Sequence, residues 1–339
     1  MQIALDAMGG DLGPQELIKG ALLALEQDDL RITLVGDEGL LKDLLQSASA
    51  SPKLLDRLNI VHAQTVVGMD ENPVDAIRKK KDSSIMVAFD LVKSGQASAA
   101  VSAGNSGATL AAGVRKLGRL KNVARPGLAT AFPTLKGPVM IMDIGANVEC
   151  RPVHLYQFGV MASAFSNLYN VKNPRVGLLT IGEESGKGNT LIKEAYNLLQ
   201  RSSLNFIGNV EGRDVFQGDV DVVVCDGFVG NIVLKISEGL AEATMKMLRE
   251  EILKSRRAKL GYLLARPAFD NFKKRVDYAE YGGALLLGIK GIGIVCHGKS
   301  SAFAIKNAII GAVAMERLKL NDDIARELAE GIDGVAAGI

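Results

Sequence analysis

The 339-residue chain contains no tryptophan, and aromatic residues make up only 5% of it. Single-stranded nucleic acids are held largely by stacking on aromatic side chains, so the usual platforms for bases are missing. The formal net charge is only +2, whereas proteins that bind the phosphate backbone carry a strongly basic face. We therefore expect no nucleic-acid partner.

Cysteine is scarce as well. The three cysteines, Cys150, Cys225 and Cys296, lie far apart and form no CxxC pair. This spacing argues against a disulfide framework and a zinc site, so we expect no metal and a reducing, cytoplasmic setting. Cys225 precedes Asp226, but no nucleophile elbow surrounds it, and we expect an inert buried thiol rather than an acyl-accepting nucleophile.

Long hydrophobic runs are also missing. No apolar stretch reaches the roughly 20 residues that a transmembrane helix needs. The chain opens on MQIALDAMGG, which predicts a strand and its turn rather than a signal peptide. Hydrophobic residues still make up 47% of the sequence, enough for a large core.

Short apolar runs alternate with amphipathic stretches along the whole chain, which predicts an α/β fold with a mainly parallel, doubly wound sheet. Expected strands are Gln2–Asp6, Arg31–Gly36, Leu58–Ala63, Ala97–Ser102, Val139–Ile144, Arg175–Ile181, Leu204–Gly208, Val220–Cys225, Leu285–Ile289 and Gly293–His297. Expected helices include Pro14–Gln27, Ser84–Lys93, Ser106–Leu117, Pro152–Tyr169, Asn231–Lys254 and Ser301–Leu318. No linker-like tract divides them, so one unit is expected.

One glycine-rich segment, RVGLLTIGEESGKGNTL at residues 175–191, predicts a strand, a turn and a helix start. Lys187 lies between Gly186 and Gly188, and Asn189 is a good N-cap. Free N–H groups at a helix start together with a lysine suit a phosphate-sized anion. The spacing is not that of a nucleotide-triphosphatase P-loop. An ordinary turn with a surface lysine is the alternative.

Five further turns after expected strands are rich in Gly, Asn, Asp and Ser. They are DAMGGD (6–11), SAGNSGA (102–108), DIGANVEC (143–150), CDGFVGN (225–231) and HGKSS (297–301). Ligands of open α/β sheets bind at the carboxyl ends of the strands. These turns therefore predict a substrate cleft along that edge.

Together with DENPVDAIRKKKDSS (70–84) and EYGGALLLGIKG (280–291), these turns resemble the bacterial phosphate acyltransferase (PlsX) family from residue 1 to about 318. The resemblance implies a three-layer α/β/α unit similar to isocitrate dehydrogenase and phosphotransacetylase. It implies conversion of acyl-[acyl carrier protein] and inorganic phosphate to acyl phosphate, for phospholipid synthesis, without a cofactor. It also implies a homodimer at the inner face of the cytoplasmic membrane, which supplies a downstream glycerol-3-phosphate acyltransferase that uses acyl phosphate.

The expected site residues follow from that chemistry, because phosphate itself attacks the thioester and the protein has only to hold it and to stabilise charge. We expect Lys187 and Asn189 to hold phosphate, Asn105 to donate to the thioester oxygen and Asp143 to orient a donor. His297 is either a proton donor or phosphate ligand, or a histidine hydrogen-bonded to its own turn. Further expected substrate contacts are Asp6, Gly9, Gly10, Gly104, Ser106, Asn147, Gly186, Gly188, Asp226, Asn231 and Lys299.

A basic segment at residues 246–275 holds ten Lys or Arg against three Asp or Glu. Leu260, Leu263 and Leu264 share one helical face, and Phe269 continues the apolar pattern beyond Pro267. Because proline breaks helices, a helix–turn–helix projection at about 246–276 with its turn at Pro267 is expected. It could contact an anionic membrane or pack in a dimer.

A smaller basic run, Arg78 to Lys81, could dock the acidic acyl carrier protein, or it could be a solvated helix face. Two other activities remain open. One is phosphotransacetylase activity on an acyl-coenzyme A thioester. The other is a nicotinamide-dependent dehydrogenase, which is disfavoured because no G-x-G-x-x-G follows the first strand.

Overall fold

The computed structural model of the protein describes residues 1–48, 50–276 and 278–335, without the side chains of residues 273–276, 278–279 and 332–335. One sheet of eleven strands, in the order β3-β2-β1-β4-β11-β10-β5-β6-β9-β7-β8, runs through it. The strands are β1 (Gln2–Asp6), β2 (Arg31–Gly36), β3 (Leu58–His62), β4 (Ala99–Ser102), β5 (Gly127–Pro133), β6 (Pro138–Met142), β7 (Val176–Leu179), β8 (Phe206–Val210), β9 (Val222–Val224), β10 (Ala284–Leu287) and β11 (Ile292–Val295).

The sheet consists of two parallel halves that run in opposite directions. Strands β3, β2, β1, β4 and β11 are parallel, as are β6, β9, β7 and β8. Between them, β10 is antiparallel to β11 and β5, and β5 is antiparallel to β6. The expected mainly parallel sheet is confirmed, but its strand-end turns do not share one edge, because the direction reverses at β10 and β5.

Strand β5, which joins the two halves, is missing from the expected strands. Its sequence, GLATAFP, is poor in the β-branched residues that mark strands. The strand is buried from Gly127 to Phe132, and a Cβ on Gly127 would lie 2.7 Å from Cε of Met142. Packing therefore overrides local propensity at this strand.

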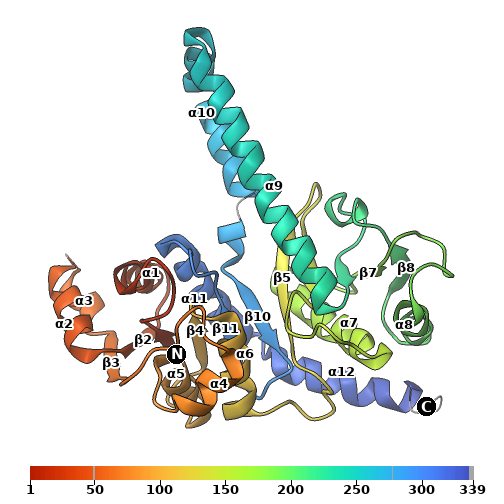
Figure 1. The fold of residues 1–339 in the computed structure, drawn as a ribbon, viewed down its shortest axis with the longest axis horizontal. Helices are drawn as coiled ribbons and strands as arrows, with labels where there is room; N and C mark the ends of the chain where they lie inside the picture. Colours follow the sequence, from red (N-terminus) through yellow and green to blue (C-terminus); the bar gives the residue numbers. More distant parts are fainter. Residues whose placement is uncertain (49, 277, 336–339) are drawn as a thin grey trace.

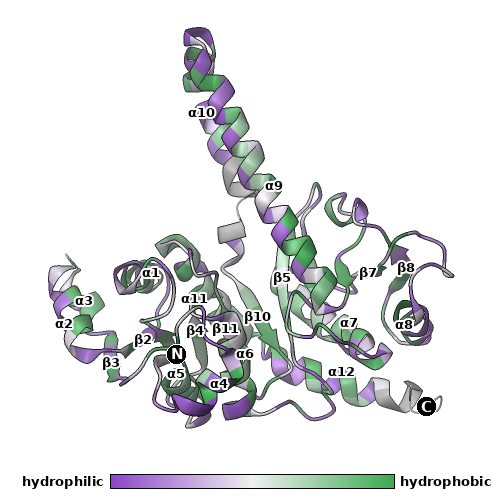
Figure 2. Cartoon of the chain, viewed as in Figure 1, coloured by the Kyte–Doolittle hydropathy of each residue, from purple (hydrophilic) through white to green (hydrophobic). Residues whose placement is uncertain are grey.

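Helices cover both faces of the sheet, which confirms the three-layer arrangement (Figure 1). One face carries α1 (Pro14–Gln27), α7 (Pro152–Ser166), α8 (Thr190–Gln200), α11 (Ala302–Arg317) and α12 (Leu320–Val335), and the other carries α4 (Pro73–Lys79), α5 (Ser84–Lys93), α6 (Ser106–Leu117) and the start of α9 (Gly227–Lys254). Short helices α2 (Glu38–Ser47) and α3 (Pro52–Leu55) flank β3. Hydrophobic residues concentrate in the strands and the inner faces of these helices (Figure 2).

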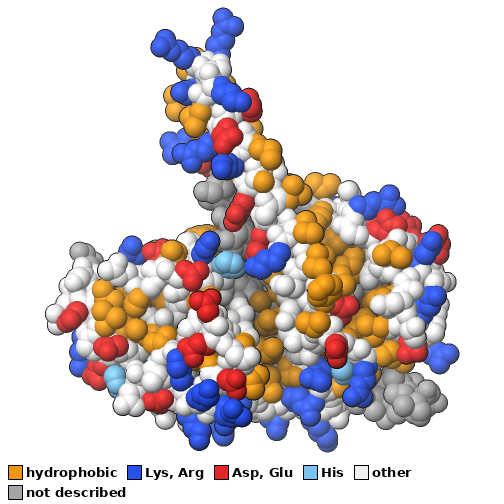
Figure 3. All heavy atoms as spheres, in the orientation of Figure 1, with side chains coloured by type: hydrophobic (Ala, Val, Ile, Leu, Met, Phe, Trp, Pro, Cys, Tyr) orange, Lys and Arg blue, Asp and Glu red, His pale blue; other side chains and the backbone are white. Residues whose placement is uncertain are grey.

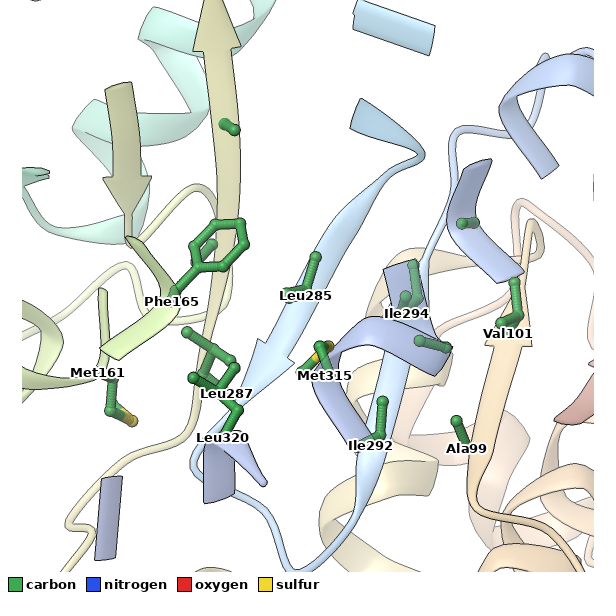
Figure 4. Close-up of a cluster of buried hydrophobic side chains, with 14 of the residues drawn as sticks. Ala99, Val101, Met161, Phe165, Leu285, Leu287, Ile292, Ile294, Met315 and Leu320 are labelled. Carbon is green, nitrogen blue, oxygen red and sulfur yellow. The ribbon is translucent and has the colours of Figure 1, made fainter. Parts of the chain in front are cut away.

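Buried side chains from both halves meet across the middle of the sheet. Leu285 and Leu287 of β10 lie among Met161 and Phe165 of α7 and Met315 of α11, all of them buried (Figure 4). Because α7 belongs to the second half and α11 packs on the first, this cluster makes their cores continuous.

A helical hairpin of α9 and α10 (Arg256–Val276) projects from the body (Figure 1). The expected turn at Pro267 is wrong, because α10 continues through that proline. The chain turns instead at Ser255, whose extended backbone ends α9 and whose Oγ accepts a hydrogen bond from Ala258 N at 3.3 Å. A serine that caps the next helix thus sets the turn.

Within the described ranges, no helix has the length and the apolar content that crossing a bilayer requires.

Candidate active site

A cavity of about 200 Å³ lies over β5, between the N-terminal parts of α6 and α9. We call it the central cavity. It lies where the strand direction reverses, the switch point at which α/β sheets bind ligands. Its polar lining comes from four separate elements and consists of Ser106, Thr130, Asn231, Lys235, Glu238, His297 and Ser300. Ser106, Asn231 and His297 are among the expected site residues.

His297 follows β11 and is exposed to the central cavity. Its Nδ1 accepts a hydrogen bond from the backbone N–H of Lys299 at 3.1 Å. In the neutral ring the proton is therefore on Nε2, which leaves that nitrogen as a hydrogen-bond donor. The expected hydrogen bond to its own turn is confirmed, and the turn orients a ring that also lines the cavity. Lys299 is exposed but does not line it.

Ser106 is the first residue of α6, and Asn105 caps that helix. The Asn105 Oδ1 accepts from Ala108 N at 3.0 Å, and its Nδ2 donates to the carbonyl oxygens of Met69 at 2.9 Å and Glu71 at 3.0 Å. Both amide hydrogens are thus used to hold the preceding loop against α6. The geometry assigns Asn105 to positioning, and its neighbour Ser106 lines the cavity.

Helix α9 contributes three polar side chains to the cavity, and two of them, Lys235 and Glu238, are missing from the expected set. With Asn231 they are spaced i, i+4 and i+7, which places all three on one helical face. Lys235 Nζ lies 3.2 Å from a carboxylate oxygen of Glu238, whose side chain is only 17% exposed. The helical spacing from Asn231 was the signal that could have identified them.

Asp143 follows β6 and is completely buried. Its carboxylate accepts hydrogen bonds from the backbone N–H groups of Leu128, Gly145, Ala146 and Asn147 and from Nδ2 of Asn147, at 2.7 to 3.2 Å. Burial raises the pKa of Asp143, and these donors act in the opposite direction. The carboxylate is therefore occupied in shaping the turn.

Asn147 and Asp226 connect the turn after β6 to the start of α9. Asn147 Nδ2 also donates to Pro126 O at 2.8 Å, and its carbonyl accepts from Gly227 N at 2.7 Å. Asp226 caps α9 by accepting from Val229 N at 2.9 Å. These residues fix the start of α9, and through it the cavity-lining residues further along the helix.

The first half of the sheet also has a buried carboxylate that accepts hydrogen bonds at the end of a strand. Asp6, at the end of β1, is buried, and burial raises its pKa. It accepts from Ser102 Oγ at 2.7 Å, and that oxygen accepts from Gly104 N at 3.1 Å. A Cβ on Gly9 would lie 2.6 Å from Gly104 N, so the turn after β1 contacts the turn after β4.

Gly10 has φ of +92°, and the next residue, Asp11, donates its backbone N–H to Gly298 O at 2.7 Å. Asp6, Gly9, Gly10 and Gly104 thus hold together the turns after β1, β4 and β11 but do not line the central cavity.

The expected phosphate-binding turn lies apart from the central cavity. Lys187, Gly186, Gly188 and Asn189 follow β7, two strands from β6 and so roughly 10 Å from its end. Asn189 Oδ1 accepts from Ile192 N at 3.0 Å and caps α8, and Lys187 Nζ lies 3.9 Å from a carboxylate oxygen of Glu184. Gly188 has φ of +91°. The local prediction of strand, turn and N-cap is confirmed, but the structure does not bring Lys187 into the cavity.

The three cysteines are not activated. Burial raises the pKa of Cys150 and of Cys296 to about 12 and that of Cys225 well above its usual value. A thiol with such a pKa is protonated at neutral pH and is a poor nucleophile. Among the described residues, no three His, Cys, Asp or Glu side chains group in a way that could hold a metal ion.

Solved structures share this fold. EutD phosphotransacetylase from Staphylococcus aureus matches with a TM-score of 0.62 and 19% identity over 93% of this chain and 94% of that one. A phosphotransacetylase from Streptococcus pyogenes matches with a TM-score of 0.64 and 16% identity over 93% and 94%. At these identities the likeness establishes the fold alone, and it confirms the expected resemblance to phosphotransacetylase.

Sequence relatives are much closer. A phosphate acyltransferase from Geotalea uraniireducens is 54% identical over 97% of this chain and 95% of its own length. One from Pelotomaculum thermopropionicum is 52% identical over 100% and 98%. The model of the fatty acid synthesis protein family matches residues 1–322. The chain therefore belongs to this family of phosphate acyltransferases.

Proposed function

We propose that the enzyme transfers an acyl group from acyl carrier protein to inorganic phosphate, which gives acyl phosphate and free carrier protein for phospholipid synthesis. The observation that carries this proposal is the central cavity itself. It holds hydrogen-bond donors and one lysine, whereas the three cysteine thiols have pKa values raised by burial. Such a site suits a reaction in which the substrate anion is the nucleophile.

In this reaction an oxygen of phosphate attacks the thioester carbonyl carbon. A C–O bond forms, the C–S bond breaks, and the pantetheine sulfur leaves. A thiol pKa is about 8.5, so the sulfur can leave as thiolate with little help from an acid. Negative charge that develops on the carbonyl oxygen needs fixed donors.

Three donors of the cavity fit that task. Ser106 lies at the N-terminus of α6, where the helix dipole is positive. His297 presents Nε2, since Nδ1 already accepts from Lys299 N. Lys235 supplies a positive charge on α9. We assign Ser106 and His297 as donors to the thioester oxygen and the leaving sulfur. We assign Lys235 to stabilising the negative charge that develops on these two atoms.

We propose that phosphate is first captured at the turn after β7, in which Lys187 and the amides of Gly186 and Gly188 lie next to the start of α8. From there it moves roughly 10 Å into the central cavity, where it attacks the thioester. Lys187 is exposed and makes only a long ion pair of 3.9 Å with Glu184, so its charge is available to an anion. The turn ends on the same edge of the sheet as β6 and β9.

The projecting hairpin is proposed as the membrane contact. Leu260, Leu263 and Leu264 are 60%, 63% and 78% exposed, and Phe269 is half-buried against Tyr262 with ring centres 5.0 Å apart. Basic residues of the hairpin flank them, namely Lys246, Arg249, Lys254, Arg256, Arg257, Lys259 and Arg266. The side chains of Lys273, Lys274 and Arg275, which belong to the same expected basic segment, lie outside the described part. Exposed leucines flanked by basic residues suit an anionic membrane surface.

A homodimer and carrier-protein docking complete the proposal. Exposed apolar residues of α9, including Ile232 and Met247, offer a surface that a second copy could cover. In the basic run, Arg78 contacts Asp75 at 3.2 Å and Lys80 contacts Glu71 at 2.5 Å. Lys79 and Lys81 are exposed, and they are the proposed contacts to an acidic carrier protein.

The activity is tested by measuring free thiol release from palmitoyl-[acyl carrier protein] with and without phosphate. We expect phosphate-dependent release and formation of acyl phosphate. Palmitoyl-coenzyme A, supplied at the same concentration, distinguishes a carrier-protein enzyme from one that acts on coenzyme A thioesters. Reduction of a nicotinamide cofactor without thiol release would contradict acyl transfer altogether.

A further inference from the structure

A second cavity adjoins the first and differs from it in chemistry. It measures about 360 Å³ and runs along the base of α9, beside the end of β5. We call it the α9 groove. Apart from Ser237, Glu238 and Thr244, its lining is apolar, and it consists of Phe132, Pro133, Phe216, Ile236, Leu240, Ala241, Met245 and Phe272.

The groove is continuous with the central cavity, because Phe132 and Glu238 line both. Phe132 is buried at the end of β5, and its ring meets the edge of Phe216 at a centroid distance of 6.4 Å. Glu238 is held by Lys235 at 3.2 Å, which keeps the charged pair at the junction. One path therefore leads from the polar donors to an apolar trough.

The trough is long and open along one side. From Lys235 to Met245 the helix advances about 15 Å, at roughly 1.5 Å per residue. Ile236 and Leu240 are 63% and 66% exposed although both line the groove. Figure 3 shows hydrophobic side chains gathered over the lower part of α9 and the neighbouring end of β5, next to charged groups at the centre of the face. An exposed apolar surface of this kind usually marks a binding site.

We propose that the α9 groove holds the acyl chain of the substrate, with the thioester in the central cavity and the alkyl tail lying between α9 and Phe216. This inference rests on the proposed function and names the part of the site that holds the alkyl tail. A groove that opened on any other part of the surface could serve a partner protein. The α9 groove begins at the donors that would face the thioester. A ligand in the groove is therefore expected to be joined to the reacting carbonyl carbon.

Ala241 has the smallest side chain that α9 contributes to the lining, so a larger side chain there would fill part of the groove. Each methylene buried against the protein favours binding by about a factor of four. A large side chain at this position would displace several methylenes of a long chain, whereas a butyryl group would end before reaching it.

The decisive measurement compares Ala241→Trp with Ala243→Trp. The two alanines are neighbours on the same half-buried stretch of α9, but they lie about 200° apart around the helix and only Ala241 lines the groove. We expect Ala241→Trp to lower the ratio of kcat/KM for palmitoyl- over butyryl-[acyl carrier protein] by tenfold or more. Ala243→Trp should keep the wild-type ratio. An unchanged ratio in Ala241→Trp would overturn the inference.

A binding measurement supports the kinetics. Because the chain has no tryptophan, Leu240→Trp and Met247→Trp each introduce a single fluorescent probe into α9. The wild-type side chains are 66% and 64% exposed, and only Leu240 lines the groove. Palmitoyl-[acyl carrier protein] without phosphate should shift the emission of Leu240→Trp to shorter wavelength and leave Met247→Trp unchanged.

The outcomes separate this inference from the proposed function. If the wild type released no thiol from either thioester, the proposed function would fail, and the fluorescence shift would still decide whether the groove binds an acyl chain. If both tryptophans shifted on raising the protein concentration alone, a second copy would cover the groove, and the inference would be wrong. A change in the mass of Ala241→Trp in solution would contradict it for the same reason.

Discussion

At the scale of single residues, the polar groups at the strand ends divide into those that hold the backbone and those that remain for a ligand. Asp143, Asn147 and Asn105 use their side-chain hydrogen bonds on turns and caps. Ser106 and His297 line the cavity. Turn-forming side chains are common in any sequence of this composition, so only the contacts separate the two groups.

The two lysines proposed to act on anions should behave differently when removed. Lys187→Ala should raise the KM for phosphate with little change in the KM for the thioester, because one charge-assisted contact is worth roughly 1.5–3 kcal/mol, or tenfold to over a hundredfold. Lys235→Ala should lower kcat instead. Initial rates at varied phosphate test this. A raised phosphate KM in Lys235→Ala alone would move the phosphate site into the central cavity.

The thiols should take no covalent part in turnover. Burial raises the pKa of Cys150 and Cys296 to about 12, so both thiols are protonated at neutral pH. We expect mass spectrometry of the enzyme quenched with palmitoyl-[acyl carrier protein] to find no acyl adduct. Replacing all three cysteines with alanine should leave phosphate-dependent thiol release largely intact. A stoichiometric adduct that phosphate removes would contradict the mechanism.

At the scale of elements, the α9–α10 hairpin separates from the body and presents its apolar face to solvent. Figure 1 shows it extending well beyond the layers of the body. A helix whose leucines are exposed gains little from folding against its own chain, so its stability and its function both depend on what it contacts.

Replacing Leu260, Leu263 and Leu264 with glutamate should abolish sedimentation with anionic liposomes. Each buried leucine contributes roughly 1.5–3 kcal/mol, and each basic residue near the surface about 1 kcal/mol. High salt should weaken binding of the wild type. Thiol release from a soluble thioester is the control and should be unaffected. If the variant became monomeric or unfolded, these leucines would be dimer core, and the membrane proposal would be wrong.

An ion pair at the edge of the second half makes its stability depend on pH. Arg175 donates from Nε and Nη2 to the two carboxylate oxygens of Asp221, each at 2.9 Å, and holds the pKa of Asp221 below its usual 3.8. This contribution to stability is complete above pH 3.8 and is lost as the pH falls through the lowered value. The thermal unfolding temperature of Asp221→Asn should therefore fall less, as the pH is lowered below 3.8, than that of the wild type. Asp70→Asn, at an exposed carboxylate, should follow the wild type.

At the scale of the whole molecule, one sheet carries two halves of opposite direction, and the cavity lies where they meet. Side chains of β10, α7 and α11 pack in one continuous core (Figure 4). Each half of the sheet therefore needs the other to bury its part of this cluster. We therefore propose that residues 1–339 form one folding unit from which the hairpin projects.

Hydrogen exchange at increasing urea concentration tests this unity. Amides of β1, in the first half, and of β7, in the second, should become unprotected with the same midpoint, because both halves lose the shared core together. Amides of α10 should exchange earlier, since among the described residues that helix packs mainly on α9. Two separate midpoints for β1 and β7 would indicate two domains.

Much of this protein is determined by its sequence alone. The strand Gln2–Asp6 and the helices Pro14–Gln27, Ser84–Lys93 and Ser106–Leu117 have the predicted bounds. Local rules suffice there, because apolar periodicity and caps act within a few residues. The family resemblance rests likewise on motifs that can be read in order along the chain.

Only the tertiary structure decided the rest. The direction of β10 and β5 and the strand nature of GLATAFP depend on contacts between distant residues. So does the site: Lys235 of α9 and His297 after β11 share a cavity that Lys187 does not line, although Lys187, like His297, follows a strand end. Distance along a chain does not determine distance across a sheet, because strand order and direction are set by how the whole core packs.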